Sequence, residues 1–216
     1  KPTLEEYTDW YRDDPVLGRN MWSTFLAREL PPVIDAQFGG TGQNSIAGIS
    51  MAGTSVLQLA IANPGVYRAV ASYSGCAMTS DPLGRAYVKS VVEVRGGGSA
   101  VNMWGPDSDP AWVDNDAYVN AAELRGTNIY ISSGTGLPGH FDTIDGPDVA
   151  GSPTKLVEQL AVGAFIESAT DRCSRQMQAR LDALGIPATY NFRDRGTHSW
   201  GYWQDDLHDS WPVLSS

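Results

Sequence analysis

The sequence lacks long apolar runs, an excess of basic residues and more than a few cysteines. No run of 18 apolar residues occurs, so we expect no membrane-spanning helix. Lys and Arg number 15 against 25 Asp and Glu, and the net charge of −10 argues against nucleic acid as a partner, because nucleic acid binds basic patches. The only cysteines, Cys76 and Cys173, lack metal-ligand spacing. We therefore expect no metal and no cofactor.

The order of predicted elements indicates a single α/β domain over residues 1–216. Short apolar runs predict strands, and longer runs with helical periodicity predict the helices between them. The first 18 residues are expected to be loop, and residues 78–120, rich in Gly, Asp, Pro and Trp, form a cap-like excursion with a helix near 83–94. Strands are expected at 45–49, 68–73, 128–132 and 188–192, and helices at 19–30, 33–38, 51–62, 153–184 and 202–210.

The stretch GISMAG places Ser50 between a strand and a helix. The strand at 45–49 is continuously apolar, as expected for a strand buried on both faces of a parallel sheet. Gly48 and Ala52 give the pattern G-x-S-x-A, a variant of the tight strand-to-helix elbow that exposes a nucleophilic serine. A serine that only caps a helix would need no such chemistry. We predict that Ser50 is a nucleophile.

A serine nucleophile needs a base, and three histidines are available. His198 lies in the loop after the last predicted strand, where this kind of fold places its base. His140 precedes the long helix and so fits the order serine, acid, histidine less well, and His208 lies among acids on the last helix, where we expect a surface residue. We predict that His198 is the base.

The acid that orients the histidine and the donors that stabilise an oxyanion are less clear from order alone. One donor should be the backbone N–H of Met51, and a second should come from a loop after an early strand, which the sequence does not reveal. Seven carboxylates qualify as the acid by chain order: Asp142, Asp145, Asp148, Glu158, Glu167, Asp171 and Asp182.

Several segments resemble the antigen 85 mycolyltransferases of mycobacteria and corynebacteria. These are the stretch SIAGISMAGTSVLQLAIANPGVYRAVASYSG, the motif Y-x-D-W-Y at residues 7–11, NMWGPDSDPAW, and GTHSWGYW at residues 196–203. The likeness covers nearly the whole chain and is closer to the corynebacterial pattern.

The resemblance implies an α/β-hydrolase fold with Ser50, Glu167 and His198 as a catalytic triad. It implies transfer of a mycolyl group from trehalose monomycolate, through an acyl-serine, to another trehalose monomycolate or to cell-wall arabinogalactan. Substrate contacts are expected from Trp10, Trp200 and Trp203. A plain carboxylesterase on the same fold and a non-catalytic cell-surface binding protein are the alternatives.

Two departures from the family concern the N-terminus and position 131, where mycobacterial members carry a cysteine near the site and this chain has Ile131. Only 49 residues precede Ser50, whereas the fold builds several strands before its elbow, so we expect one unpaired sheet edge and a separate N-terminal piece of the same protein. Cys76 follows a strand and Cys173 lies about two helical turns beyond Glu167. In a protein exported to the cell envelope, as this resemblance implies, they are expected to pair as a disulfide, with two buried thiols as the alternative.

Overall fold

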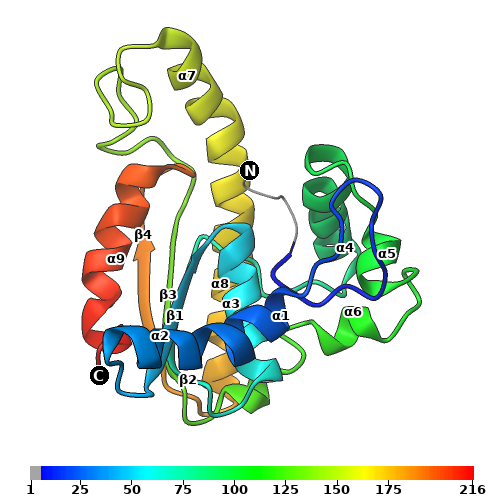
Figure 1. Cartoon of the computed structure of the whole chain (residues 1–216). Helices are drawn as coiled ribbons and strands as arrows, with labels where there is room; N and C mark the ends of the chain where they lie inside the picture. Colours follow the sequence, from blue (N-terminus) through cyan, green and yellow to red (C-terminus); the bar gives the residue numbers. More distant parts are fainter. Residues whose placement is uncertain (1–5) are drawn as a thin grey trace.

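The computed structural model describes residues 6–216, and the first five residues of the expected N-terminal loop lie outside that range. Four parallel strands form one sheet in the order β1 (Asn44–Ile49), β2 (Tyr67–Tyr73), β3 (Asn128–Gly134) and β4 (Thr189–Arg193). The spatial order of the strands equals their order along the chain (Figure 1). All four expected strands are present within one or two residues of their predicted bounds.

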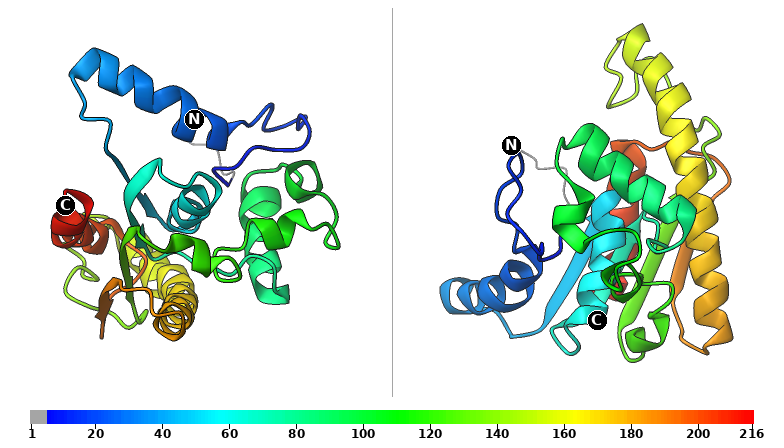
Figure 2. Two further views of the ribbon diagram at one scale, coloured as in Figure 1. Left: turned by 90° about the horizontal axis from the view of Figure 1, so that it is seen from below. Right: turned by 90° about the vertical axis from the view of Figure 1, so that its right-hand side faces the viewer.

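Helices cover both faces of the sheet. The helices α3 (Met51–Ala62) and α8 (Ala164–Ala183) pack on one face, and α9 (Trp200–Leu214) packs on the other, as the view from below shows (Figure 2). Parallel strands require such crossovers, which bury the sheet between helical layers. The expected α/β-hydrolase architecture is confirmed.

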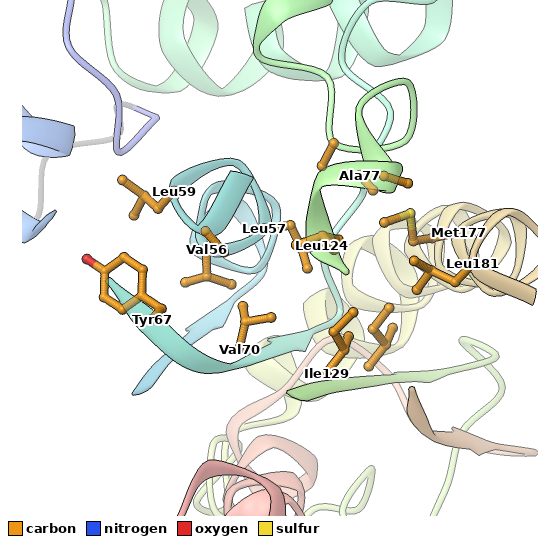
Figure 3. Close-up of a cluster of buried hydrophobic side chains, with 14 of the residues drawn as sticks. Val56, Leu57, Leu59, Tyr67, Val70, Ala77, Leu124, Ile129, Met177 and Leu181 are labelled. Carbon is orange, nitrogen blue, oxygen red and sulfur yellow. The ribbon is translucent and has the colours of Figure 1, made fainter. Parts of the chain in front are cut away.

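The main core lies between the sheet and the α3–α8 layer (Figure 3). Val56 of α3 faces Val70 of β2, Met177 and Leu181 of α8 lie over Ile129 of β3, and Leu59 belongs to the same cluster. These side chains are at most 3% exposed, so each contributes about 1.5–3 kcal/mol of hydrophobic stabilisation. This core fixes the two helices whose upper ends carry the site.

The N-terminal helical segment is one continuous run, whereas we expected two separate helices at 19–30 and 33–38. It runs through α1 (Trp22–Thr24), the π-helical turn η1 (Phe25–Glu29) and α2 (Leu30–Phe38). We expected Pro31 and Pro32 to end a helix, and this was wrong. They lie in the first turn of α2, where backbone N–H groups need no intrahelical acceptor, so a proline there breaks no hydrogen bond.

Strand β1 is less buried than expected. We expected burial on both faces, but Ser45 and Ala47 are exposed, whereas β2 and β3 are almost wholly buried. β1 is more exposed because it lies at the end of the sheet and, among the described residues, pairs with β2 only. The expectation of an unpaired sheet edge agrees with this arrangement.

The excursion between β2 and β3 folds as a cluster of short helices beside the sheet (Figures 1 and 2). Its core is formed mainly by Val92, Met103, Trp104 and Trp112, and the N-terminal loop adds Trp10, which is 3% exposed. The expectation that Trp10 contacts substrate is therefore corrected, since its indole packs inside this cluster. The elements are α4 (Pro82–Lys89), η2 (Ser90–Arg95), α5 (Ala100–Trp104), α6 (Ala111–Asp114) and η3 (Ala121–Leu124).

The long helix expected at 153–184 is present in three continuous parts. α7 (Pro153–Glu158) begins at a Ser152 cap and lies beyond the end of the sheet. The π-helical turn η4 (Gln159–Gly163) follows, and α8 continues in the same direction along the sheet (Figure 1). Cys173 of α8 forms a disulfide with Cys76, with Cα atoms 5.0 Å apart. Ser174 adds a hydrogen bond of 3.2 Å to the Gly75 carbonyl. The loop after β2 is thereby joined to the helix that carries Glu167.

We expect the Cys76→Ser/Cys173→Ser double variant to lose about 2–4 kcal/mol of unfolding free energy, because the disulfide closes a long loop and restricts the unfolded chain. Urea unfolding followed by tryptophan fluorescence measures the loss. Reductant should destabilise the wild type to the level of the double variant and leave the variant itself unchanged. An equal urea midpoint for the oxidised wild type and the double variant would contradict the prediction.

Candidate functional site

Ser50 occupies a strained turn between β1 and α3. Its backbone has φ 58° and ψ −118°, in the left-handed half of the conformational map where only glycine is relaxed. The Ser50 N–H donates to the Tyr73 carbonyl at 2.8 Å, which ties the turn to the end of β2. The side chain is therefore presented at the carboxyl end of the sheet, where sites of open parallel sheets lie.

The neighbours of Ser50 are small because the turn brings two backbones together. A Cβ on Gly48 would lie 2.3 Å from the Ala52 carbonyl oxygen, and one on Gly53 would lie 2.9 Å from the Tyr73 carbonyl oxygen. Only glycine fits at these two positions, and Gly48 is the first residue of the G-x-S-x-A pattern. Met51 begins α3, so its N–H has no acceptor one turn earlier in the helix and is available to a ligand.

His198 and Glu167 form a close pair. His198 lies in the loop between β4 and α9, and its Nδ1 is 2.7 Å from Glu167 Oε2. The His198 side chain is 10% exposed and that of Glu167 is 0% exposed. Of the seven carboxylates allowed by chain order, Glu167 is the one that contacts this histidine among the described residues. A buried carboxylate at Nδ1 fixes the ring and stabilises its charged form.

Glu167 is held by donors that sequence reasoning missed. Its Oε1 accepts hydrogen bonds from Ser74 Oγ at 2.8 Å, Ser133 Oγ at 3.2 Å and Gly134 N at 2.6 Å. Trp203 Nε1 in turn donates to Ser74 Oγ at 2.9 Å. The only signal in the sequence was their position, since Ser74, Ser133 and Gly134 all lie where β2 and β3 end.

The His198 loop has its own anchor at Asp142. This carboxylate accepts hydrogen bonds from the Thr197 hydroxyl, from Gln159 Nε2 at 2.6 Å and from the Tyr202 hydroxyl at 2.7 Å. Burial raises the pKa of Asp142, but these hydrogen bonds outweigh burial and lower it. Asp142, a candidate for the acid by chain order, instead holds the residue next to His198.

The remaining histidines and candidate acids make no hydrogen bond or ion pair with His198 or Glu167 among the described residues. His140 stacks on Phe141 and lies 3.8 Å from Asp205 at the surface. His208 is exposed on α9. Asp148 accepts the Trp200 N–H at 2.7 Å at the start of α9, and Asp171 pairs with Arg175. Asp145, Glu158 and Asp182 are exposed.

A cavity of about 380 Å³ opens beside His198. Its lining combines the Trp rings at the start of α9 with charged groups from the excursion, the loop after β3 and α7. Trp203 is 7% exposed and packs edge-on against His198 at 4.8 Å, whereas Trp200 is 63% exposed. The lining residues are Arg95, Asp148, Lys155, Glu158, Gln159, Val162, Gly163, Ile166, His198, Ser199, Trp200 and Trp203.

A second buried carboxyl group, that of Glu6, lies on the α3 side of the elbow. It is 0% exposed, Ser55 Oγ donates to it at 2.8 Å, and Oε1 has no hydrogen-bond partner among the described residues. Burial raises the pKa of Glu6 to about 7. Burial raises the pKa of Tyr87 of α4 as well, and the nearby carboxylates of Glu6 and Glu167 raise it further.

The described residues show no group of three or more His, Cys, Asp or Glu side chains arranged to hold a metal ion. In the same part of the chain, no helix has the length and apolarity needed to cross a bilayer. A serine on a strand-to-helix elbow and a histidine whose Nδ1 contacts a buried carboxylate are features found in serine hydrolases with an α/β-hydrolase fold.

The chain belongs to the esterase family, because a family model described as "Putative esterase" matches residues 5–213. Diacylglycerol acyltransferase/mycolyltransferase Ag85A of Mycobacterium leprae is 36% identical over 96% of this chain and 61% of its own length. Ag85B of Mycobacterium avium is 33% identical, again over 96% of this chain and 61% of its own length. The chain thus spans about three fifths of the curated relatives that it matches.

Solved structures agree on the fold. The crystal structure of Mycobacterium tuberculosis MPT51 (FbpC1) matches with a TM-score of 0.76 and 24% identity, over 98% of this chain and 73% of that chain. An S-formylglutathione hydrolase from Agrobacterium tumefaciens matches with a TM-score of 0.60 and 18% identity, over 96% of this chain and 61% of that chain. At these identities the likeness establishes the α/β-hydrolase fold alone.

Proposed function

We propose that this chain carries the catalytic core of a mycolyltransferase. It moves a mycolyl group from trehalose monomycolate, through an ester on Ser50, to a hydroxyl of another trehalose monomycolate or of cell-wall arabinogalactan. The observation that carries the proposal is the pairing of His198 with buried Glu167 at the sheet edge where the Ser50 elbow lies. The mycolyltransferase names of the relatives support the substrate class.

In this proposal the reaction consists of two acyl transfers. His198 Nε2 takes the Ser50 proton as Oγ bonds to the ester carbonyl carbon, and the Met51 N–H stabilises the resulting oxyanion. The intermediate collapses, the carbon–oxygen bond to trehalose breaks, and His198 returns the proton to the departing sugar oxygen. The acceptor hydroxyl then gives its proton to His198 as its oxygen bonds to the acyl carbon. The bond from that carbon to Ser50 Oγ breaks, and His198 returns the proton to Oγ.

Glu167 keeps the histidine in the tautomer that these steps require. With Glu167 ionised at Nδ1, the Nδ1–H points to the carboxylate and Nε2 is free to accept a proton. Trp203 acts through Ser74 to hold Glu167, so its role is positioning. Trp200, largely exposed at the cavity mouth, is proposed to pack against a sugar ring.

The proposal also covers the location of the protein and the segment that pairs with its sheet. A trehalose mycolate substrate requires export to the cell envelope, and the Cys76–Cys173 disulfide suits an oxidising compartment. The half-exposed edge strand β1 and the span of three fifths of the relatives' length support pairing with a separate N-terminal piece of the same protein. Residues 78–120 are proposed to act as a cap beside Ser50, within one domain over residues 1–216.

The test supplies trehalose monomycolate together with isotopically labelled trehalose. Transfer predicts that label enters the monomycolate pool and that trehalose dimycolate forms, with none of either in a Ser50→Ala control. Release of free mycolic acid without exchange would instead identify a carboxylesterase. A protein that neither exchanges label, releases acid nor reacts with a fluorophosphonate would be a non-catalytic binding protein, which would refute the proposal.

A further inference from the structure

A buried ion pair lies beside Glu167, next to the carboxylate oxygen that His198 does not contact. Arg193 is the last residue of β4, and its Nη1 is 2.5 Å from Oδ1 of Asp206 in α9. The other terminal nitrogen, Nη2, is 3.9 Å from Glu167 Oε1, whereas His198 Nδ1 contacts Oε2. One guanidinium therefore lies between two carboxylates, bonded to Asp206 and only near Glu167.

The three charged groups are shielded from water. The side chains of Asp206 and Glu167 are 0% exposed and that of Arg193 is 15% exposed. Asp206 Oδ1 also accepts hydrogen bonds from Tyr130 Oη at 3.5 Å and from Asn191 Nδ2 at 3.4 Å. Because little water screens these groups, a change of charge on one of them acts strongly on the others.

Arg193 has unused donors that face this buried space. Among the described residues, its Nε and Nη2 are buried without a hydrogen-bond acceptor. A buried donor without an acceptor is costly, and Glu167 Oε1 is a charged acceptor close to Nη2. The short bond to Asp206 holds the guanidinium back. Loss of the Asp206 charge would free Arg193 to turn toward Glu167.

The charge of this buried group changes when His198 takes a proton. With His198 neutral, Glu167, Asp206 and Arg193 together carry one net negative charge, and the proton brings the total to zero. Burial raises the pKa of Asp206 to about 6, and Arg193 opposes the rise, so Asp206 is ionised at neutral pH. The ionisable side chains that face Asp206 from the elements around it are Tyr73 of β2, Tyr130 of β3, Glu167 of α8 and Arg193 of β4.

We propose that Asp206 is a positioning residue, which holds Arg193 away from Glu167 and so keeps the negative charge of Glu167 available to His198. The inference rests on the acyl-serine chemistry proposed above. No covalent bond to Arg193 or Asp206 forms or breaks. The pair acts through Glu167, which stabilises the charged His198 that forms when Ser50 gives up its proton.

The test measures kcat and the pH dependence of kcat/KM for a p-nitrophenyl ester. In Asp206→Asn the cation of Arg193 stays and its partner charge is lost, so the charged form of His198 becomes less stable. The acid limb of kcat/KM, which reports protonation of the base in the free enzyme, should move to lower pH by about one unit. A weaker base accepts the Ser50 proton less readily, so kcat should fall about 3- to 10-fold.

The double variant Arg193→Met/Asp206→Asn separates this role from a merely structural one. It removes both charges, so the acid limb and kcat should return most of the way to the wild-type values, although two buried groups are changed instead of one. The control is Asp209→Asn, an exposed carboxylate of the same helix that accepts from Asn191 Nδ2 at 3.2 Å. It should keep the wild-type acid limb and kcat.

Titration of reactive Ser50 with a fluorophosphonate counts folded sites, so kcat refers to correctly folded protein even if a variant is less stable. An unshifted acid limb in Asp206→Asn, or a double variant no better than the single one, would overturn this inference and leave the proposed function standing. Arg193→Met, which leaves Asp206 unchanged, should show no shift to lower pH, and such a shift would also overturn the inference. An unreactive Ser50 in the wild type would overturn both.

Discussion

Ser50→Ala is expected to abolish covalent labelling by a fluorophosphonate and to lower ester turnover by about 10⁶-fold, the scale seen when a triad serine is removed. The reason is chemical, because alanine has no oxygen to form the acyl ester. Folding should be preserved, since the Ser50 side chain caps no backbone group of α3 and alanine suits the same tight space. In-gel fluorescence measures labelling, and thermal unfolding measures stability.

The matched control for this experiment is Ser168→Ala. Ser168 is an exposed serine of α8 whose hydroxyl bonds only the Phe165 carbonyl of its own helix among the described residues. It should label as the wild type does. Persistent labelling of Ser50→Ala would show that another residue is the nucleophile and would remove the basis of the proposed reaction.

Glu167→Gln is expected to lower kcat by about 10³–10⁴-fold, as when the acid of a serine–histidine–acid triad becomes an amide. Three donors, from Ser74, Ser133 and Gly134, converge on Oε1, so the amide oxygen of glutamine must take that place. Its NH₂ group then faces His198 Nδ1. That nitrogen must become an acceptor, the proton moves to Nε2, and the ring can no longer accept the Ser50 proton.

Kinetics and nitrogen NMR of the His198 ring distinguish this tautomer change from simple unfolding. The Nε2–H tautomer should dominate in Glu167→Gln and the Nδ1–H tautomer in the wild type. Glu123→Gln, an exposed change on η3, serves as control and should match the wild type in both measurements. A Glu167→Gln variant with wild-type kcat would mean that another group orients the base.

The sequence was most informative where backbone geometry restricts residue type. Gly48 marks the elbow because the turn leaves no room for a Cβ there, and that requirement is local. The strands and helices around Ser50 were likewise predictable from short apolar runs. The bounds of α3, Met51–Ala62, agree with the expectation at both ends.

The acid could not be chosen by chain order, because its identity depends on packing between segments distant in sequence. Glu167 meets His198 through the path of α8 along the sheet, and Ser74 and Ser133 reach it from two strand ends. Only the family resemblance distinguished Glu167 from six other carboxylates. The role of Asp142 was likewise not predictable from chain order, since it holds Thr197 through a tertiary contact.

Two errors have a common physical cause. Trp10 was assigned to substrate from a motif, yet the excursion provides enough apolar surface to bury it. Pro31 was taken as a helix end, yet a π-helical turn before it lets a new helical turn begin there. In both cases a neighbouring segment, which no local pattern describes, decided the outcome.

Neighbouring strands of the sheet are also consecutive along the chain, and this order affects how the sheet can form during synthesis. Each of β2, β3 and β4 adds beside the strand made before it, so a chain emerging from its N-terminal side can extend the sheet stepwise. The elbow at Ser50 is present early in this sequence of events. Glu167 and His198 arrive with the last third of the chain, and the Cys76–Cys173 bond can close only after α8 has docked. In this order of assembly, the Ser50 elbow forms before Glu167 and His198, the proposed acid and base, are in place.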